Sequence, residues 1–402
     1  MFVKQRRHIV RWILLLTTLA LVAGCGGSGD DPPLSSGEAI TAFSFTAEAN
    51  PQLGADITGT IDEANGTILL TGPLDVDAVA GLKASFTTTG TQTQVSVGGV
   101  AQESGVTEHS FAGPLTYRVT AEDGSTRDYQ VHAAYWKLPS GPADGTSPEG
   151  NASLPQVAMD SIGNTVIVWN QSDGSHYQIF KSEHRDGTWT HPANISPDER
   201  DASSPQVAMD DSGNAVIVWW QYDEGNIEQI FKSEYRDGEW THPASLSDNI
   251  SPDGWSPRLP QVAMDSSGNA VIVWQQYDGS TLRIFKSEYR DGEWAHPASL
   301  SDNISPDEGN ASSPQVAMDD SGNTVIVWKQ YDGSHYQIFK SEYRDGEWTH
   351  PASLSDSISP DGWDASLFHV AMDDSGNAVI VWFQYDGCRN QIFKSEYRFW
   401  EE

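Results

Sequence analysis

The sequence Pro-Gln-Val-Ala-Met-Asp, or a close variant of it, recurs through the C-terminal two-thirds of the chain and is followed each time by a Val-Ile-Val-Trp run. A fixed period of this length is typical of one supersecondary unit used repeatedly, with each copy packed on the next. The repeats lie near residues 154–203, 204–258, 259–312, 313–366 and 367–400. The steps between their methionines, by subtraction, are 50, 55, 54 and 54 residues for Met159, Met209, Met264, Met318 and Met372.

Each repeat carries four strand-like segments, which we call A to D. In the second and third repeats, strand A is the Pro-Gln-Val-Ala-Met-Asp run, strand B is 270–274, strand C is 284–290 and strand D is 239–243. The β-branched and aromatic content of strands B and C is typical of strands buried on both faces. Four-stranded antiparallel units at this period, without a helical pattern, predict a β-propeller.

The connections within a repeat also point to tight antiparallel pairing. Strands C and D are joined by Asp-Gly, as at Asp237 and Gly238, which is a strong hairpin signal. Strands A and B are joined by Asp-Ser-Gly-Asn, as at Asp210 to Asn214, where Gly and Asn accept positive φ angles. This loop lacks the alternating carboxylates of an EF-hand, so we interpret it as turn chemistry and predict no metal site and no cofactor.

The two ends of the repeat region predict how the array closes. The last repeat stops before a full strand D, while Trp136 lies 12 residues before Pro148, by subtraction, as Trp240 does before Pro252. Residues 135–140 therefore resemble a displaced strand D that pairs with the last strand C. This predicts a five-bladed β-propeller over 135–402, closed by N- and C-terminal strands, without open sheet edges. The alternative is an open array, which would need polar terminal units that the sequence does not show.

Residues 38–134 form a different unit. Short alternating segments such as 40–45, 67–70 and 116–119 are separated by turn signals, which predicts an antiparallel β-sandwich. The opening run 40–45, the Gly59-Thr60-Ile61 run and a closing pattern that includes Tyr117 and Tyr129 resemble the Ig-like modules found beside the lipid anchor of bacterial surface lipoproteins. That resemblance implies a spacer without chemistry.

The first residues are typical of a targeting segment. A basic stretch is followed by an apolar run over 13–23 that is too short to span a bilayer comfortably. Val22-Ala23-Gly24-Cys25 resembles the lipobox of bacterial lipoproteins, in which the Cys is acylated. The resemblance implies a signal peptide over 1–24, a membrane anchor at Cys25 and a place on the outer membrane or cell surface. Residues 25–37 are rich in Gly, Ser and Pro and predict a flexible tether.

Charge limits the partners. The chain holds 56 acidic and 23 basic side chains, for a formal charge of −33, so phosphate backbones are repelled and nucleic acid is not an expected partner. We expect a monomer.

The repeated charged residues give little sign of catalysis. The run from Ser341 to Trp348 resembles the Asp-box of sialidase-type propellers, which is structural in that family. Catalysis there needs clustered arginines, whereas the arginines here recur once per repeat and should not converge. We interpret Lys232, Glu234 and Arg236, which share one face of strand C, as inter-blade ion pairs. The repeated histidines (His191, His242, His296 and His350) should likewise be too far apart to share a zinc ion.

Departures from the repeat are more informative. The B–C and D–A loops should emerge on one side of the propeller, where aromatic rings flanked by Asp, Asn and Ser suit sugars. Trp255 and Trp363 occur in only two of the D–A loops, so symmetric packing does not explain them. The B–C loops add tyrosines that either bind a ligand or seal the blades, namely Tyr222, Tyr277, Tyr331 and Tyr385.

These observations favour a non-catalytic binding module for a carbohydrate or a surface protein, displayed at the cell surface. One alternative is a glycosidase of the sialidase or arabinanase type, which would need two carboxylates about 5–9.5 Å apart at the axis. The other alternative is a purely structural envelope protein.

Overall fold

The computed structural model describes residues 35–74, 76–90, 92–135, 144–198 and 200–398. The chain divides into two compact units, 1–142 and 143–402, which are treated separately below. The predicted lipid-bearing Cys25 lies outside the described residues, as does all but the first residue of the predicted strand 135–140. Within the described ranges, no helix has the length and apolarity that crossing a membrane requires.

The N-terminal unit is built almost entirely of strands, and every segment predicted from alternation overlaps one of them. Eight strands form a continuous path in the order β5-β1-β2-β3-β10-β9-β6-β7, and β4 pairs separately with β8. The elements are β1 (Ile40–Phe45), β2 (Ile57–Asp62), β3 (Thr67–Leu70), α1 (Val76–Val79), β4 (Leu82–Lys83), β5 (Ser85–Thr88), β6 (Gln94–Val97), β7 (Val100–Ala101), β8 (Glu108–His109), β9 (Leu115–Thr120) and β10 (Thr126–Ala133).

One pairing in this unit differs from the predicted antiparallel sandwich. Strand β10 runs parallel to β3, with Val131 opposite Ile68, although it is antiparallel to β9. Alternate residues of each strand still point into one core, where Phe45 meets Phe111 edge-on at 4.7 Å between ring centroids. The parallel pair follows from the long crossover between β3 and β10, which local alternation cannot reveal.

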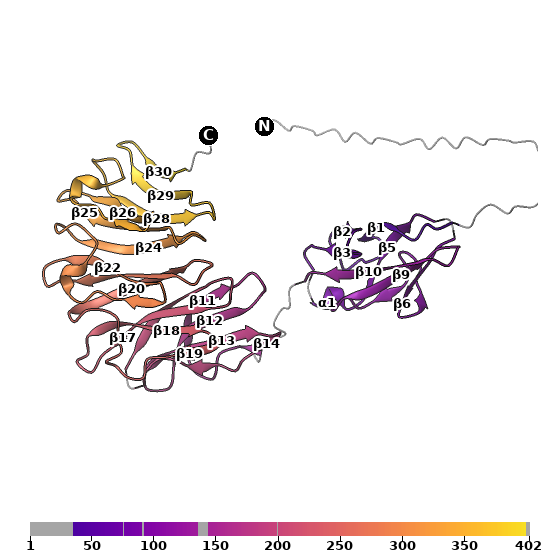
Figure 1. Ribbon diagram of the computed structural model, residues 1–402, viewed down its shortest axis with the longest axis horizontal. Coiled ribbons are helices and arrows are strands. Elements are labelled where there is room, and N and C mark those ends of the chain that lie inside the picture. Colours follow the sequence, from indigo (N-terminus) through magenta and orange to yellow (C-terminus); the bar gives the residue numbers. More distant parts are fainter. Residues whose placement is uncertain (1–34, 75, 91, 136–143, 199, 399–402) are drawn as a thin grey trace, which may run out of the picture. The chain divides into compact units, whose positions relative to one another are not determined.

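The C-terminal unit contains five sheets, one for each repeat, stacked one after another along the chain (Figure 1). Sheets 1 to 4 each have the four predicted strands, and sheet 5 has three. The strands are β11 (Ala152–Met159), β12 (Thr165–Ser172), β13 (Tyr177–Arg185), β14 (Thr188–Trp189) and the short β15 (Ala193–Asn194) in sheet 1; β16 (Ala202–Met209), β17 (Ala215–Tyr222), β18 (Glu228–Arg236) and β19 (Glu239–Thr241) in sheet 2; β20 (Trp255–Met264), β21 (Ala270–Tyr277), β22 (Leu282–Arg290) and β23 (Glu293–Ala295) in sheet 3; β24 (Ala311–Met318), β25 (Thr324–Tyr331), β26 (Tyr336–Arg344) and β27 (Glu347–Thr349) in sheet 4; and β28 (Ala365–Met372), β29 (Ala378–Tyr385) and β30 (Asn390–Tyr397) in sheet 5. Short 3-10 turns occur at Leu300–Asp302 and Leu354–Asp356.

The tight turns have the predicted chemistry. At the β18–β19 hairpin, Asp237 and Gly238 both have positive φ, 52° and 87°, as a twisted two-residue hairpin requires. Between β16 and β17, the buried Asp210 carboxylate accepts the backbone N–H groups of Ser212 and Asn214 at 2.9 and 2.7 Å. The other four repeats build the same turn, so this loop is a structural element of the repeat.

The apolar core lies between successive sheets. Val166 and Val168 of β12 pack against Trp219 and Phe231 of the next sheet, and the same arrangement recurs at the three following junctions. Strands β17, β21 and β25 are buried on both faces, as their composition predicted, because each one contributes to the core before it and to the core after it.

The predicted inter-blade ion pairs prove to lie within single strands. On β13, Lys181 and Arg185 each contact Glu183 at 2.8 Å. The contact with the next sheet is instead aromatic, because the Lys181 ammonium lies 4.3 Å from the Trp240 ring centroid. Residues at i, i+2 and i+4 share one face of a strand, so side chains long enough to reach one another pair there first.

Ring closure is not observed. In the part of the chain that the structure describes, β30 pairs with β29 and with no other strand, and sheets 1 and 5 lie at opposite ends of the stack (Figure 1). The described residues therefore form an open stack of five sheets, and the predicted closed five-bladed ring is not confirmed. Closure depends on the twist that accumulates from one sheet to the next, which a repeated sequence does not specify.

Candidate binding site on the loop face

One end of the stack carries the B–C and D–A loops, and we call it the loop face. All of the aromatic residues predicted to bind a ligand lie there, at strand ends. The four tyrosines Tyr222, Tyr277, Tyr331 and Tyr385 are the last residues of β17, β21, β25 and β29.

The two tryptophans occupy one repeat position, nine residues before Met264 and Met372 by subtraction. The other repeats have Gly150, Arg200 and Gly309 there. Trp255 begins β20 directly opposite Tyr277 in the sheet register and is 61% exposed. Trp363 precedes β28 and is 45% exposed. The repeat therefore places two large apolar side chains in solvent at equivalent points, where no packing requirement of the repeat accounts for them.

Trp363 is the better organised of the two. Its ring centroid lies 4.8 Å from that of Tyr385 in a T-shaped contact, and 6.4 Å from the imidazole of His335 on the preceding sheet. Its carbonyl oxygen accepts a 2.8 Å hydrogen bond from Gln384. We call His335, Trp363 and Tyr385 the Trp363 cluster. Three rings from two sheets thus form a fixed aromatic surface that remains open to solvent.

Tyr222 and Tyr331 have local roles instead. Tyr331 donates its hydroxyl to the carbonyl of Gly333 in its own hairpin and stacks edge-on with Tyr336. Tyr222 contacts Trp220 edge-on at 5.5 Å. Burial raises the pKa of the Tyr222 hydroxyl, and the nearby Glu228 carboxylate raises it further. The predicted tyrosines are therefore not equivalent, and Tyr385 alone joins a tryptophan from a D–A loop in a ring contact.

Glu228 is a site residue that the repeat pattern did not single out. Its buried carboxylate forms an ion pair with Arg258 of the next sheet. Burial raises the pKa of Glu228, but hydrogen bonds from Ser256 and Arg258 outweigh that effect and leave it below its usual value. Ser256 directly follows Trp255, so this contact ties the Trp255 segment to sheet 2. The signal available in the sequence was the absence of an acid at this position in the other repeats.

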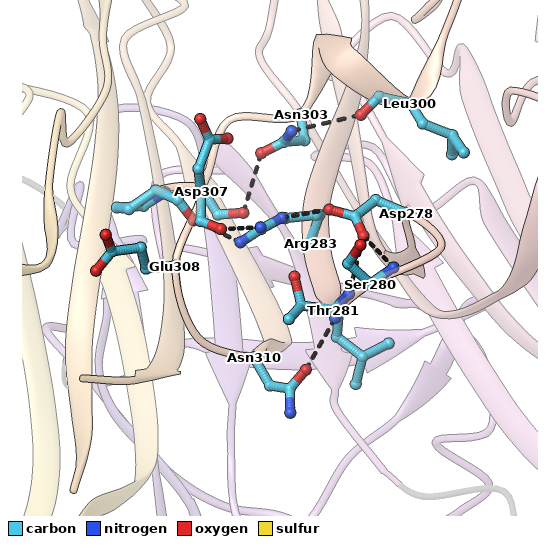
Figure 2. Close-up of polar contacts among 12 residues, drawn as sticks. Asp278, Ser280, Thr281, Arg283, Leu300, Asn303, Asp307, Glu308 and Asn310 are labelled. Atoms are coloured by element: carbon cyan, nitrogen blue, oxygen red, sulfur yellow. Dashed lines mark hydrogen bonds and ion pairs between the residues drawn. The ribbon is translucent and has the colours of Figure 1, made fainter. Parts of the chain in front are cut away.

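The loops of sheet 3 are held by a second departure from the repeat, at Arg283 (Figure 2). The other repeats have Gln at this position: Gln178, Gln229, Gln337 and Gln391. The buried Arg283 guanidinium donates to the Asp278 carboxylate at 2.7 Å and to the carbonyl oxygen of Pro306 at 2.7 Å, and also to that of Asp307. It thereby joins the B–C loop to the following D–A loop.

Asp278 is organised by the same contacts. Burial raises the pKa of this carboxyl, but the N–H of Thr281 and the Arg283 guanidinium more than compensate, so the pKa lies below its ordinary value. The opposite side of the loop is fixed by Leu282, whose N–H donates to Asn310 at 3.0 Å (Figure 2). The loop face of sheet 3 is therefore held rigidly by polar contacts within the protein.

The repeated charged residues do not form a shared centre. Arg236 covers Tyr289 of the following sheet at 3.6 Å, and Arg185, Arg290 and Arg344 repeat this contact at their own junctions. His242, His296 and His350 each contact the serine hydroxyl of the neighbouring strand C in their own sheet. Across the described residues, no three His, Cys, Asp or Glu side chains are grouped as metal ligands.

Comparison with protein families adds an independent observation on the N-terminal unit. Residues 40–133 match the family described as SGBP, N-terminal. SGBP stands for surface glycan-binding protein. The match covers β1 to β10 and leaves the stack of sheets unassigned. A search of curated proteins gave no match.

Among solved structures, the chain is similar to propeller-type carbohydrate-active proteins. It is 15% identical to a Hadza microbial sialidase over 71% of this chain and 64% of that chain, with a TM-score of 0.40. It is 13% identical to the GH93 alpha-L-arabinofuranosidase of Fusarium graminearum over 59% of this chain and 79% of that chain, with a TM-score of 0.35. An ulvan lyase of family PL25 is 11% identical over 70% of each chain, with a TM-score of 0.43.

Proposed function

We propose that this chain is a surface glycan-binding protein and that its stack of sheets binds carbohydrate without turnover through the Trp363 cluster. The observation that carries the proposal is the exposed Trp363, held edge-on against Tyr385 at 4.8 Å beside His335. A fixed aromatic face binds the apolar face of a sugar ring at little entropic cost, because the ring is already ordered. The family match of residues 40–133 supports the same class of ligand.

Polar groups beside the cluster suit the hydroxyl groups of a sugar. The exposed Asp364 accepts the N–H of Tyr336 through one carboxylate oxygen, which leaves the other oxygen as a hydrogen-bond acceptor. The His335 imidazole supplies a further donor or acceptor. Trp255, opposite Tyr277, offers a second and less enclosed platform at the equivalent point of sheet 3. Two similar sites on one molecule would raise the apparent affinity for a repeating polysaccharide.

We further propose that Cys25 carries a lipid anchor, which would place this binding face at the cell surface. The test is incorporation of labelled palmitate, compared between the wild-type chain and Cys25→Ser. Equal labelling of the two forms would exclude Cys25 as the acylated residue.

Binding is best tested by titration calorimetry of the purified protein against a panel of soluble polysaccharides, with a parallel assay for released sugars. We expect heat of binding without sugar release, and Trp363→Ala should weaken binding by at least about tenfold, the factor that ~1.4 kcal/mol corresponds to. Trp189→Ala is the matched control, because Trp189 is also exposed but lies on the outer face of sheet 1. Failure of Trp363→Ala to reduce binding would exclude the cluster, and release of sugar would overturn the non-catalytic assignment.

A further inference from the structure

The same contact holds each sheet to the next one. At the first three junctions, the strand C lysine lies over the strand D tryptophan of the following sheet, with 4.3 Å for Lys181 and Trp240 and 4.6 Å at the next two junctions. The glutamate two residues later accepts the N–H of that tryptophan, and the arginine two residues after that covers a tyrosine. One sheet thus supplies a Lys-Glu-Arg edge, and the next sheet supplies a Trp-Tyr edge.

The fourth junction shows what the tryptophan contributes. In the described residues, sheet 5 has no strand D, so Lys340 has no tryptophan to cover. The Lys340 side chain is 32% exposed, twice the 16% of Lys286 at the junction before. Arg344 still covers Tyr397 at 3.7 Å, so the sheets remain joined.

Sheet 1 presents an unoccupied receiving face. Val157 and Met159 on β11 are 63% and 62% exposed, whereas the equivalent Val207 and Met209 are packed against the preceding sheet. Trp189 is also exposed, at the position of Trp240, and lies 5.4 Å from His184, which replaces the usual tyrosine. A cavity of about 550 Å³ opens on this face, lined in part by Val157, Ile167 and Trp169.

Sheet 5 presents the opposite half of the junction. Ile392 is 74% exposed, whereas its counterpart Ile338 in sheet 4 is fully buried by the sheet that follows. The Lys394 side chain is 65% exposed, and Glu396 and Arg398 continue the Lys-Glu-Arg edge without a partner sheet. Burial of these apolar side chains would stabilise any contact that covers them.

We infer that the outer face of sheet 5 docks on the outer face of sheet 1 of a second copy of this chain, head to tail. The two faces are the two halves of a junction that the molecule already builds four times, and their charged and aromatic groups are complementary: Lys394 and Glu396 would meet Trp189, and Arg398 would meet His184. Within one chain, the two faces lie at opposite ends of the stack (Figure 1). A second copy therefore satisfies both without bending the four existing junctions.

This interface is heterologous, because the two copies contribute different faces. Each dimer retains one free receiving face and one free Lys-Glu-Arg edge. Association should therefore continue beyond the dimer, either to a closed ring or to a longer array.

The test is sedimentation velocity of the full chain in detergent, with protein concentration varied from the micromolar to the submillimolar range. We expect species at multiples of the 43.9 kDa monomer that grow with concentration. Lys394→Glu combined with Arg398→Glu should weaken association by more than about tenfold, because both charges would then be reversed at the contact. Arg389→Glu, an exposed charge in a loop of the same sheet, is the matched control and should associate normally.

Mixing separates this mode from any symmetric one. Trp189→Ala should remove the receiving face, and Lys394→Glu/Arg398→Glu should remove the opposite face, so each variant alone should remain monomeric. An equimolar mixture should form a one-to-one dimer and nothing larger. A monomeric wild-type chain at every concentration, from closure on its own opposite end or on residues 135–140, would overturn the inference, as would a mixture that stays monomeric.

The outcome is independent of glycan binding. Trp363→Ala should associate like the wild-type chain, and Trp189→Ala should bind polysaccharide like it at concentrations where both are monomeric. Loss of both properties in either variant would indicate misfolding, which far-ultraviolet circular dichroism detects. In that case Trp189→Phe, which keeps an aromatic ring but loses the indole N–H, should weaken association without unfolding and would contradict the inference if it did not.

Discussion

Trp240 donates its indole N–H to the carboxylate of Glu183, which lies 57 residues earlier in the chain and in the preceding sheet, at 3.0 Å. Burial by itself raises the pKa of Glu183, but Lys181 and Arg185 beside it hold the pKa below its usual value. The carboxylate is therefore charged at neutral pH and shared by two cations and one indole. This single group links the ion pairs within a strand to the packing between sheets.

Removing the indole N–H from this contact should destabilise the stack. We expect Trp240→Phe to lower the free energy of unfolding by about 1–3 kcal/mol, the range for a hydrogen bond to a charged group. Urea denaturation followed by tryptophan fluorescence measures the change. Trp189→Phe is the matched control at low protein concentration, because Trp189 has no preceding sheet and should cost little. Equal losses in the two variants would show that the N–H···carboxylate contact adds no stability.

Arg283 offers a test in which the repeat provides its own substitute. Arg283→Gln should be nearly neutral, because Gln229 at the same position of sheet 2 accepts the hydroxyl of Ser251 and also approaches Asp223. Arg283→Met should cost about 3 kcal/mol or more, since it leaves the buried Asp278 carboxylate without its cation and several carbonyl groups without a donor. Thermal unfolding of the two variants compares them directly. Similar melting temperatures would mean that the loop connection is not needed for stability.

The histidines predict a fall in stability in mild acid. Burial and the nearby lysines Lys232 and Lys286 lower the pKa of His296 and His350 from 6.5 to about 4. The folded state therefore favours neutral imidazole, and stability is full above pH 6.5 and declines as the pH falls from 6.5 towards 4. Denaturant midpoints across this range should show the decline. His296→Gln with His350→Gln should flatten it, and an unchanged slope in that double variant would contradict the assignment. The glutamates of the junctions act in a lower window, below their usual pKa of 4.5.

Cys388 provides a reporter beside the Trp363 cluster. It is an exposed free thiol next to Gly387, where an added Cβ would lie 3.8 Å from the Trp363 indole nitrogen. In a chain with Cys25→Ser, Cys388 is the remaining cysteine, since the sequence holds two. A polysaccharide bound at the cluster should slow the reaction of this thiol with Ellman's reagent severalfold. Binding detected by calorimetry without any protection of Cys388 would place the ligand elsewhere, with the Trp255 platform as the next candidate.

Local structure followed from the sequence to a large extent. The strand order of the repeat, the Asp-Gly hairpins and the Asp210 turn were all predictable, because each depends on side-chain alternation or on φ preferences of a few neighbouring residues. The parallel β3–β10 pair and the ion pairs within a strand were not predicted. The first depends on a long crossover, and the second on how far Lys and Glu side chains reach along one face.

The candidate site was predictable only in part. Trp255 and Trp363 stood out because they interrupt the repeat, and the structure places both on the loop face in solvent. Their different partners did not follow from that interruption, because His335 and Tyr385 come from two sheets that meet only in the folded stack. Arg283 and Glu228 also interrupt the repeat, but without a structure a buried loop connection cannot be told from a surface substitution.

The sequence by itself determined the repeating unit, because its period, its turns and its alternation act over distances of a few residues. The tertiary structure alone decided that the five sheets form an open stack with two complementary outer faces. That outcome depends on the twist summed over four junctions, in which small differences in packing angle accumulate, and no single repeat contains that information.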